Sequence, residues 1–289
     1  MRVEFVSDVE SFAARAWPLL AADEGNHTQL LRALANARDA SLPPGERWHA
    51  ALVHADEGRV TAAARRFQNT WFLSTGPEAA LQALGAAVRA AACADRPAAI
   101  AGCVGEADAV RAFERGCGMP MRVHFDLRLF RLDGEPMRPP PAEAAACGRL
   151  QRATLDDLPA LLELAQAFRV EAKLPETAEQ LAAGMPHHVQ AGSQYLWYDA
   201  HGALAGFIGG QSIPPSGARV GPVYTRPAQR GRGIGAAMVA TLSRQLLAAG
   251  ARSVFLFTDA RNPTSNALYR RIGFAPIGRH LHLRVDRAG

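Results

Sequence analysis

The chain has 289 residues, of which 48% are hydrophobic, so it can bury a large core, and its length is that of two domains. Charged residues make up 20% and form no long run of one sign, which excludes a globally disordered chain. The net charge of +5 is mild and aromatic residues are only 7%, so a nucleic-acid groove is not indicated, whereas an anionic small ligand is compatible.

The start of the chain and its cysteines indicate a compartment. MRVEFVSDVESF lacks the basic region and apolar core of a secretion signal, and no apolar run reaches the roughly 18 residues that span a bilayer. Cys93, Cys103, Cys117 and Cys147 form no CxxC pair, and no Cys/His pair has zinc-ligand spacing. We therefore expect reduced, buried thiols, no metal site, no membrane contact and a cytoplasmic protein.

The first half alternates strands with helices. A hairpin is expected over residues 47–67, turning at 56–58, and a strand follows at 69–75. A helix at 76–92, a strand at 98–104, a helix at 106–117 and a strand at 121–132 complete this half.

A composition break separates the halves. Pro139, Pro140 and Pro141 stand in series and an alanine-rich stretch follows. Consecutive prolines favour an extended segment, so we interpret residues 136–147 as a linker between domains at 1–135 and 148–289.

The second half has a similar rhythm. A strand at 148–154 precedes a helix capped by Thr154 and a second helix over about 177–184 that ends at Gly184. The remaining elements are expected as strands at 194–200, 203–211 and 218–225, a helix at 233–249, a strand at 253–258, a helix at 263–272 and a strand at 280–285. This order predicts an α/β fold (an α+β type of mixed sheet) with helices on both faces, and the rhythm shared by both halves predicts a structural duplication.

Residues 230–235, RGRGIG, lie between a predicted strand and an apolar helix. Backbone N–H groups at a helix start carry partial positive charge and no intrahelical acceptor, and glycine lets a diphosphate approach them. Arg230 and Arg232 can add charge-assisted bonds. The G-x-G-x-G spacing matches neither the dinucleotide fingerprint nor the Walker motif. The loop therefore predicts a phosphate site of another kind, with a purely structural turn as the alternative.

The strand before this loop contains Gly221-Pro222, although proline cannot donate a hydrogen bond within a central strand. A bulge there would splay the strand from its neighbour and leave backbone groups of Val223, Tyr224 and Thr225 free for an amide-bearing ligand. The alternative is an edge strand with an incidental proline.

These residues resemble a family. Arg230-x-x-Gly233-x-Gly235 matches the pyrophosphate motif of the GNAT superfamily of N-acetyltransferases, Q/R-x-x-G-x-G/A. About thirty residues later, the run from Asn262 to Phe274, NPTSNALYRRIGF, resembles the second signature of that family. The resemblance covers residues 148–289, whereas residues 1–135 share only an order of elements.

The resemblance implies two tandem GNAT-like domains with splayed central strands, acetyl-CoA as cofactor, and no metal. Because the corresponding junction at residues 74–77 lacks the glycine loop, the first domain is expected to be a degenerate copy without phosphate binding. The cofactor-binding residues that it implies are Val223, Tyr224, Thr225, Arg230, Gly231, Arg232, Gly233, Ile234, Gly235, Ala236, Asn262 and Ser265.

By the same resemblance, Tyr269 is the general acid that protonates the departing CoA thiolate, with packing against the sheet as the alternative. No base is assigned, because Glu171, Glu176 and Glu179 are each expected to be solvated helix residues and a water relay is an equal option.

The function that follows is acetyl-CoA-dependent N-acetyl transfer to a primary amine of a small-molecule acceptor, by direct attack in a ternary complex. A variant is acyl transfer to a cysteinyl or amino-sugar amine, as in tandem relatives that resemble mycothiol synthase. The alternative class is a non-catalytic acyl-CoA-binding or sensing module. Formation of a homodimer interface is one of the roles left open for the first domain.

Overall fold

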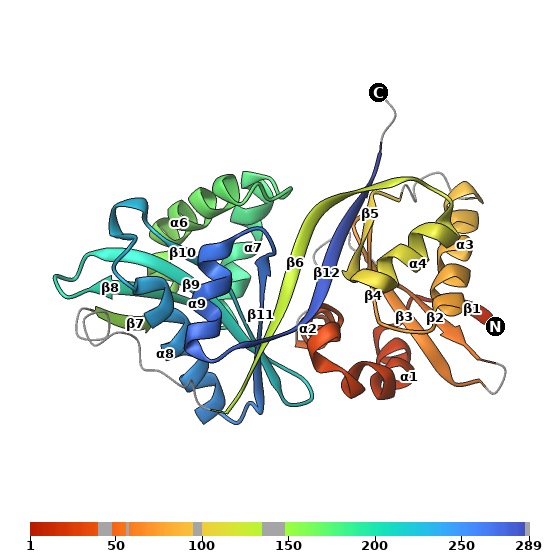
Figure 1. The fold of residues 1–289 in the computed structure, drawn as a ribbon, viewed down its shortest axis with the longest axis horizontal. Helices are drawn as coiled ribbons and strands as arrows, with labels where there is room; N and C mark the ends of the chain where they lie inside the picture. The colour runs from red at the N-terminus through yellow and green to blue at the C-terminus, as the bar shows by residue number, and fades with distance from the viewer. Residues whose placement is uncertain (40–47, 56–57, 95–99, 135–147, 287–289) are drawn as a thin grey trace.

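The computed structural model describes residues 1–286 except 40–47, 56–57, 95–99 and 135–147 (Figure 1). The predicted linker therefore lies outside the described residues. The first half contains β1 (Arg2–Val6), α1 (Val9–Ala22), α2 (Glu24–Asp39), β2 (His49–His54), β3 (Val60–Phe67), β4 (Thr70–Leu73), α3 (Glu78–Ala94), β5 (Gly102–Glu106), α4 (Ala107–Cys117) and β6 (Met121–Asp133).

The second half repeats this order. It contains β7 (Gly148–Arg152), a 3-10 turn (Leu155–Asp157), α6 (Leu158–Glu171), α7 (Ala178–Gln190), β8 (Gln194–Asp199), β9 (Leu204–Ile213), β10 (Gly217–Thr225), α8 (Ile234–Ala248), β11 (Ser253–Asp259), α9 (Pro263–Ile272) and β12 (Ala275–Val285). The expected mixed α/β fold is confirmed.

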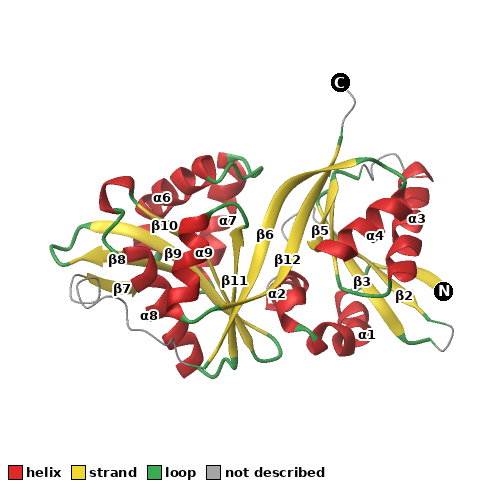
Figure 2. Ribbon diagram, viewed as in Figure 1, coloured by secondary structure: helices red, strands yellow, loops and turns green. Residues whose placement is uncertain are grey.

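The described strands form one twelve-stranded sheet in the order β1-β2-β3-β4-β5-β12-β6-β11-β10-β9-β8-β7. Helices cover both of its faces (Figure 2). In the second half, α8 and α9 pack on one face around Met238 and Leu242, while α6 and α7 pack on the other around Leu161 and Phe207. The first half is built alike, with α3 and α4 on one face and α1 and α2 on the other.

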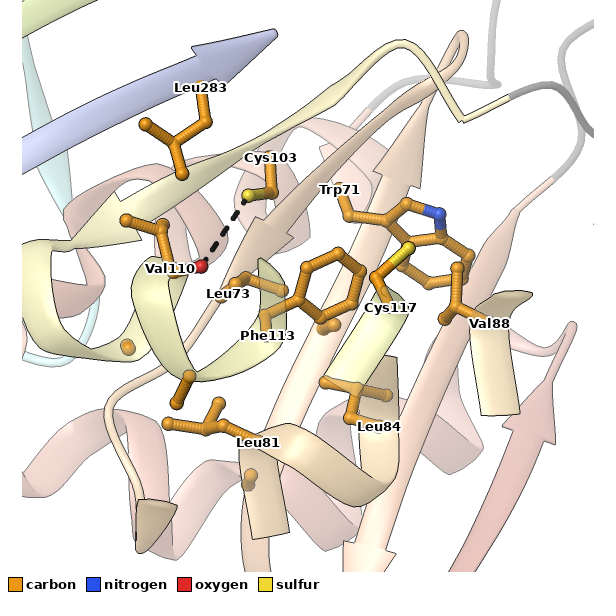
Figure 3. Close-up of a cluster of buried hydrophobic side chains, with 14 of the residues drawn as sticks. Trp71, Leu73, Leu81, Leu84, Val88, Cys103, Val110, Phe113, Cys117 and Leu283 are labelled. Carbon is orange, nitrogen blue, oxygen red and sulfur yellow. Dashed lines mark hydrogen bonds between the residues drawn. The ribbon is translucent and has the colours of Figure 1, made fainter. Parts of the chain in front are cut away.

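The last strand of each half is exchanged. β12 lies between β5 and β6, and β6 pairs with β11 along Leu127–Asp133. Leu281 and Leu283 of β12 are buried in the core of the first half, in the same cluster as Cys103 and Phe113, whereas Phe130 of β6 is buried in the core of the second half. Figure 3 shows Leu283 on the side of this core where Cys103 lies. The boundaries 1–135 and 148–289 stay a prediction, but each half completes its sheet with a strand from the other.

Two helical features differ from expectation. The helix expected to end at Gly184 runs on to Gln190 through Pro186, because Met185 and Val189 are buried against the sheet and hold this last part in place. The helices α1 and α2 were not expected. Asp8 caps α1 by accepting from the Ser11 N–H at 2.6 Å, and Phe12 and Leu20 are fully buried along that helix.

The three cysteines in the described residues are free thiols. Cys103 and Cys117 are buried free thiols, as expected, whereas Cys93 is exposed near the end of α3, so the expected burial is wrong for Cys93. Cys147 lies outside the described residues. Burial raises the pKa of the Cys103 thiol, which keeps it protonated. In the part of the chain that the structure describes, no helix is long and apolar enough to cross a membrane.

Candidate active site

The proline-containing strand β10 is an interior strand, so the reading of an edge strand is wrong. Its register against β9 shifts between Val220 and Val223, which is the expected bulge, and the Gly221–Pro222 peptide in it is cis. Against β11, β10 pairs only over Gly217–Arg219. From Val220 onward the two parallel strands therefore separate.

The separation leaves backbone groups of β10 free on the side of β11. The Arg226 N–H donates to the Ala205 carbonyl of β9, and alternate residues of an antiparallel strand turn to the same neighbour. Tyr224 therefore faces β9, whereas the backbone groups of Val223 and Thr225 face the gap. Of the three residues predicted to present free groups, Val223 does so with both groups and Thr225 with its N–H, since its carbonyl accepts from Arg230.

The loop 230–235 has the geometry of an anion cradle. Gly231 and Gly233 have φ angles of +78° and +77°, which glycine adopts without strain. No side chain caps α8, and its first backbone bond runs from the Ala237 N–H to the Gly233 carbonyl at 3.0 Å. Six consecutive N–H groups, from Gly231 to Ala236, have no acceptor within the described ranges. A Cβ atom on Gly235 would meet nothing closer than 3.8 Å, so the space before the helix is open.

The two arginines of the loop bind within the protein. Arg230 donates to Glu171 Oε2 of α6 at 2.6 Å and to the Thr225 carbonyl at 3.1 Å, and its guanidinium lies 5.5 Å from the centre of the Tyr224 ring. The bond to Glu171 raises the pKa of Arg230. Arg232 donates to the side chain of Gln229. Arg230 thus braces the loop against α6.

The second signature forms α9 as its residue types require. Asn262 caps the helix by accepting from the Ser265 N–H at 3.0 Å, and Gly273 ends it at a φ of +113°. Asn266 donates to the carbonyls of Asp259 and Asn262 at 3.0 and 2.6 Å, which fixes the end of β11 to the start of α9. The capping role of Asn262 needs no ligand.

Tyr269 lies in the last turns of α9, 8% exposed, between the rings of Phe130 and Phe274 at 6.0 and 6.2 Å. Burial raises its pKa to about 12, so the hydroxyl stays protonated at neutral pH. The ring packs in the core, as the alternative expected, and the residue also lines the cleft described next, while its role as a general acid stays a prediction.

One cleft, of about 2210 Å³, collects the predicted residues. It is lined by every residue named above as cofactor-binding or catalytic. The sequence reasoning missed its other walls, which include Arg32 of α2, His124 and Phe125 of β6, His188 of α7, and Gln211 and Arg219. Arg32, His124 and Phe125 belong to the first half, so no local motif could have indicated them.

Of the acidic residues in this region, some line the cleft and Glu179 does not. Glu171 and Glu176 line the cleft, together with Asp259 at the end of β11. Glu171 is bound to Arg230, and Asp259 is bound to Arg261 at 3.2 Å. Burial raises the pKa of Glu176, whereas the pKa of Glu179, bonded at the cap of α7, is lowered. Two of the three expected solvated glutamates therefore face the cleft.

The corresponding junction of the first half is closed. The Thr75 N–H donates to Nε2 of buried His27 at 3.0 Å, and a Cβ atom on Gly76 would meet the Thr61 carbonyl at 2.6 Å. The Ala80 and Leu81 N–H groups at the start of α3 bond to the Pro77 carbonyl. Here a side chain and a backbone carbonyl accept hydrogen bonds from N–H groups at the start of the helix, whereas the N–H groups of the glycine loop in the second half have no acceptor among the described residues.

Comparisons with known proteins agree with this geometry. Residues 158–274 match the model of the acetyltransferase (GNAT) family. A search among curated proteins found no match. Among solved structures, a GCN5-related N-acetyltransferase from Sphaerobacter thermophilus is 20% identical with a TM-score of 0.63, covering 98% of this chain and 95% of that one.

Two further structures cover nearly the whole chain. A tandem GNAT protein of the clavulanic acid biosynthesis pathway, solved without AcCoA, is 18% identical with a TM-score of 0.62, over 98% of both chains. A GNAT-family acetyltransferase from Colwellia psychrerythraea is 10% identical with a TM-score of 0.58, over 99% of this chain and 100% of that one. The chain thus has the fold of the GNAT acetyltransferases, a tandem GNAT protein among them, and its residues 158–274 match the model of that family.

Proposed function

We propose that the protein is an acetyl-CoA-dependent N-acetyltransferase that transfers an acetyl group to a primary amine by direct attack in a ternary complex. The observation that carries the proposal is the row of six N–H groups at the start of α8 that have no acceptor among the described residues. This row opens into the same cleft as the gap between β10 and β11. Such a row, at the positive end of a helix, is suited to a diphosphate.

The residues of this chain fit acetyl-CoA along the length of the cleft. The N–H groups of residues 231–236 would hold the pyrophosphate, and the backbone groups of Val223 together with the Thr225 N–H would bond the amides of the pantetheine arm, while the Thr225 carbonyl accepts from Arg230. Bound acetyl-CoA would supply a thioester as the acetyl donor. An N–H of β10 can also donate to the thioester carbonyl oxygen, on which negative charge develops during attack.

Tyr269 is proposed to donate its proton to the leaving sulfur. Its raised pKa keeps it in the form that can donate, and α9 holds it in the wall of the cleft. No general base is assigned. The incoming amine is deprotonated by a water relay or by a carboxylate of the cleft.

The experiment is a thiol-release assay with acetyl-CoA and a panel of primary amines, beside a direct measurement of CoA binding. The proposal predicts CoA binding and turnover with at least one amine class. CoA binding without turnover of any amine would favour the sensing module instead. Absence of CoA binding would overturn both.

A further inference from the structure

The cleft extends beyond the gap between β10 and β11 to three basic side chains, two arginines and a histidine. Arg219 lies on β10, Arg32 on α2 and His188 on α7, and all three line the cleft. They also lie within electrostatic range of one another, because Arg32 acts on both Arg219 and His188. Both arginines keep some solvent exposure because they face the cleft.

Within the described residues, these groups have no negatively charged partner. No carboxylate of the described chain forms an ion pair with Arg32 or Arg219 or is among the groups that act on them electrostatically. Arg219 Nε is buried without an acceptor, and the guanidinium lies 5.4 Å from the centre of the Phe257 ring. Enclosed positive charge is costly unless a negative group meets it.

The acidic residues of the cleft are engaged elsewhere. Among the described residues that line it, Lys and Arg number eight (Arg32, Arg169, Lys173, Arg219, Arg230, Arg232, Arg261, Arg271) and Asp and Glu three (Glu171, Glu176, Asp259). Glu171 and Asp259 are bound to arginines at the cofactor end, and Glu176 is acted on by Arg169. Burial lowers the pKa of Arg219 to about 9 and that of His188 to about 4, with Arg32 adding to both shifts.

The surroundings hold these groups in place. Gln211 is directly opposite Arg219 on β9 and lines the same wall. The helix that carries Arg32 is fixed to the β9–β10 turn, because Ser216 donates to Glu24 from its hydroxyl at 2.8 Å and its N–H at 3.2 Å. The wall therefore joins both halves of the chain.

We infer that Arg219 and Arg32 form a subsite for an anionic oxygen group, a carboxylate or a phosphate, on the amine acceptor. Guanidinium groups bind both in the same bidentate way. Arg219 precedes Val223 by four residues on β10, so at most about 13 Å of strand separates the subsite from the gap. The acceptor is therefore an amine whose anionic group stands several bonds away from the nitrogen.

The inference rests on the proposed function, so its first test uses no turnover. With saturating CoA present to fill the glycine loop, inorganic phosphate and glutarate are titrated into the full-length protein by calorimetry. Wild type should bind at least one of them, and Arg219→Gln and Arg32→Gln should each weaken that binding at least tenfold. Arg252→Gln, an exposed arginine outside the cleft, should bind as wild type. Equal affinities in all four proteins, or no anion binding in wild type, would overturn the subsite while CoA binding still stood.

Turnover then tests which anion the acceptor carries. The matched pairs are 6-aminohexanoate with its amide, and glucosamine 6-phosphate with glucosamine. For an accepted pair, wild type should favour the anionic amine at least tenfold in kcat/KM, and Arg219→Gln should remove the preference mainly through KM. Equal use of both members of a pair by wild type would count against the subsite. Because removing an unpaired enclosed charge does not break a bond, we expect Arg219→Gln to unfold no more easily than wild type.

Discussion

For single residues, the sequence predicts local contacts but not contacts between distant parts of the chain. The pattern around residue 230 indicated an arginine beside a phosphate loop, but the partner of Arg230 is Glu171, 59 residues earlier. No local pattern connects the two, because α6 and the loop are distant in sequence and meet only in the folded structure. Asn262 shows the opposite case, since its capping bond to Ser265 follows directly from its place before Pro263.

Tyr269→Phe tests the proposed acid. We expect kcat to fall by about 10²-fold or more, since general acid catalysis contributes roughly 10²–10⁴-fold, with CoA affinity unchanged. Because the Tyr269 pKa is raised to about 12, wild-type activity should show no loss from tyrosine ionisation up to about pH 10. The measurement is steady-state kinetics from pH 6 to 10. An unchanged rate for the variant across that range would remove Tyr269 from the reaction and leave it as a packing residue.

At the scale of elements, periodicity predicted most strands and helices of the second half. It predicted the β10 bulge for a physical reason, because an interior proline cannot complete a ladder. It missed α1 and α2, although the cap at Asp8 and buried Phe12, Ala16 and Leu20 at four-residue spacing were signals of α1. The end of α7 was misplaced because burial of Met185 and Val189 outweighed the glycine and proline near its middle.

β12 offers a test of the strand exchange. Leu283→Ala should reduce the free energy of unfolding by roughly 2–5 kcal/mol, because this fully buried side chain packs in the core of the first half. Ile277→Ala, in the same strand but 36% exposed, is the control and should cost much less. Urea unfolding measures both. Similar small losses for the two variants would mean that β12 is not seated in that core.

At the scale of the whole molecule, the exchange makes the two halves depend on each other. The repeated order of elements and the pairs of helices on each face support the proposal of a duplication, in which only the second copy keeps an open phosphate loop. Sequence could indicate the repeat but not the exchange, because a strand pattern does not specify which sheet it joins. The same limit hid Arg32, which reaches the cleft from the other half.

Lowering the pH should reduce the free energy of unfolding. His280 and His282 on β12 have pKa values lowered to about 4, chiefly by burial. Between their ordinary pKa of about 6.5 and 4, the unfolded chain binds protons that the folded chain does not, so stability falls as pH falls. From pH 7 to 5 the loss should be about 2 kcal/mol for each histidine. Urea unfolding at both pH values measures it, and His282→Gln should lessen the difference. Equal stability of wild type at the two pH values would contradict this account.

Calorimetric titration of CoA into wild type and Gly235→Val tests whether the glycine loop before α8 holds acetyl-CoA. The space at Gly235 is open in the protein itself, so valine should fold there but fill the cradle. Ala248→Val, at the exposed far end of the same helix, controls for valine in a helix. We predict binding by wild type and the control and at least a hundredfold weaker binding by Gly235→Val. Equal CoA affinity in all three proteins, or no binding in any, would contradict the account.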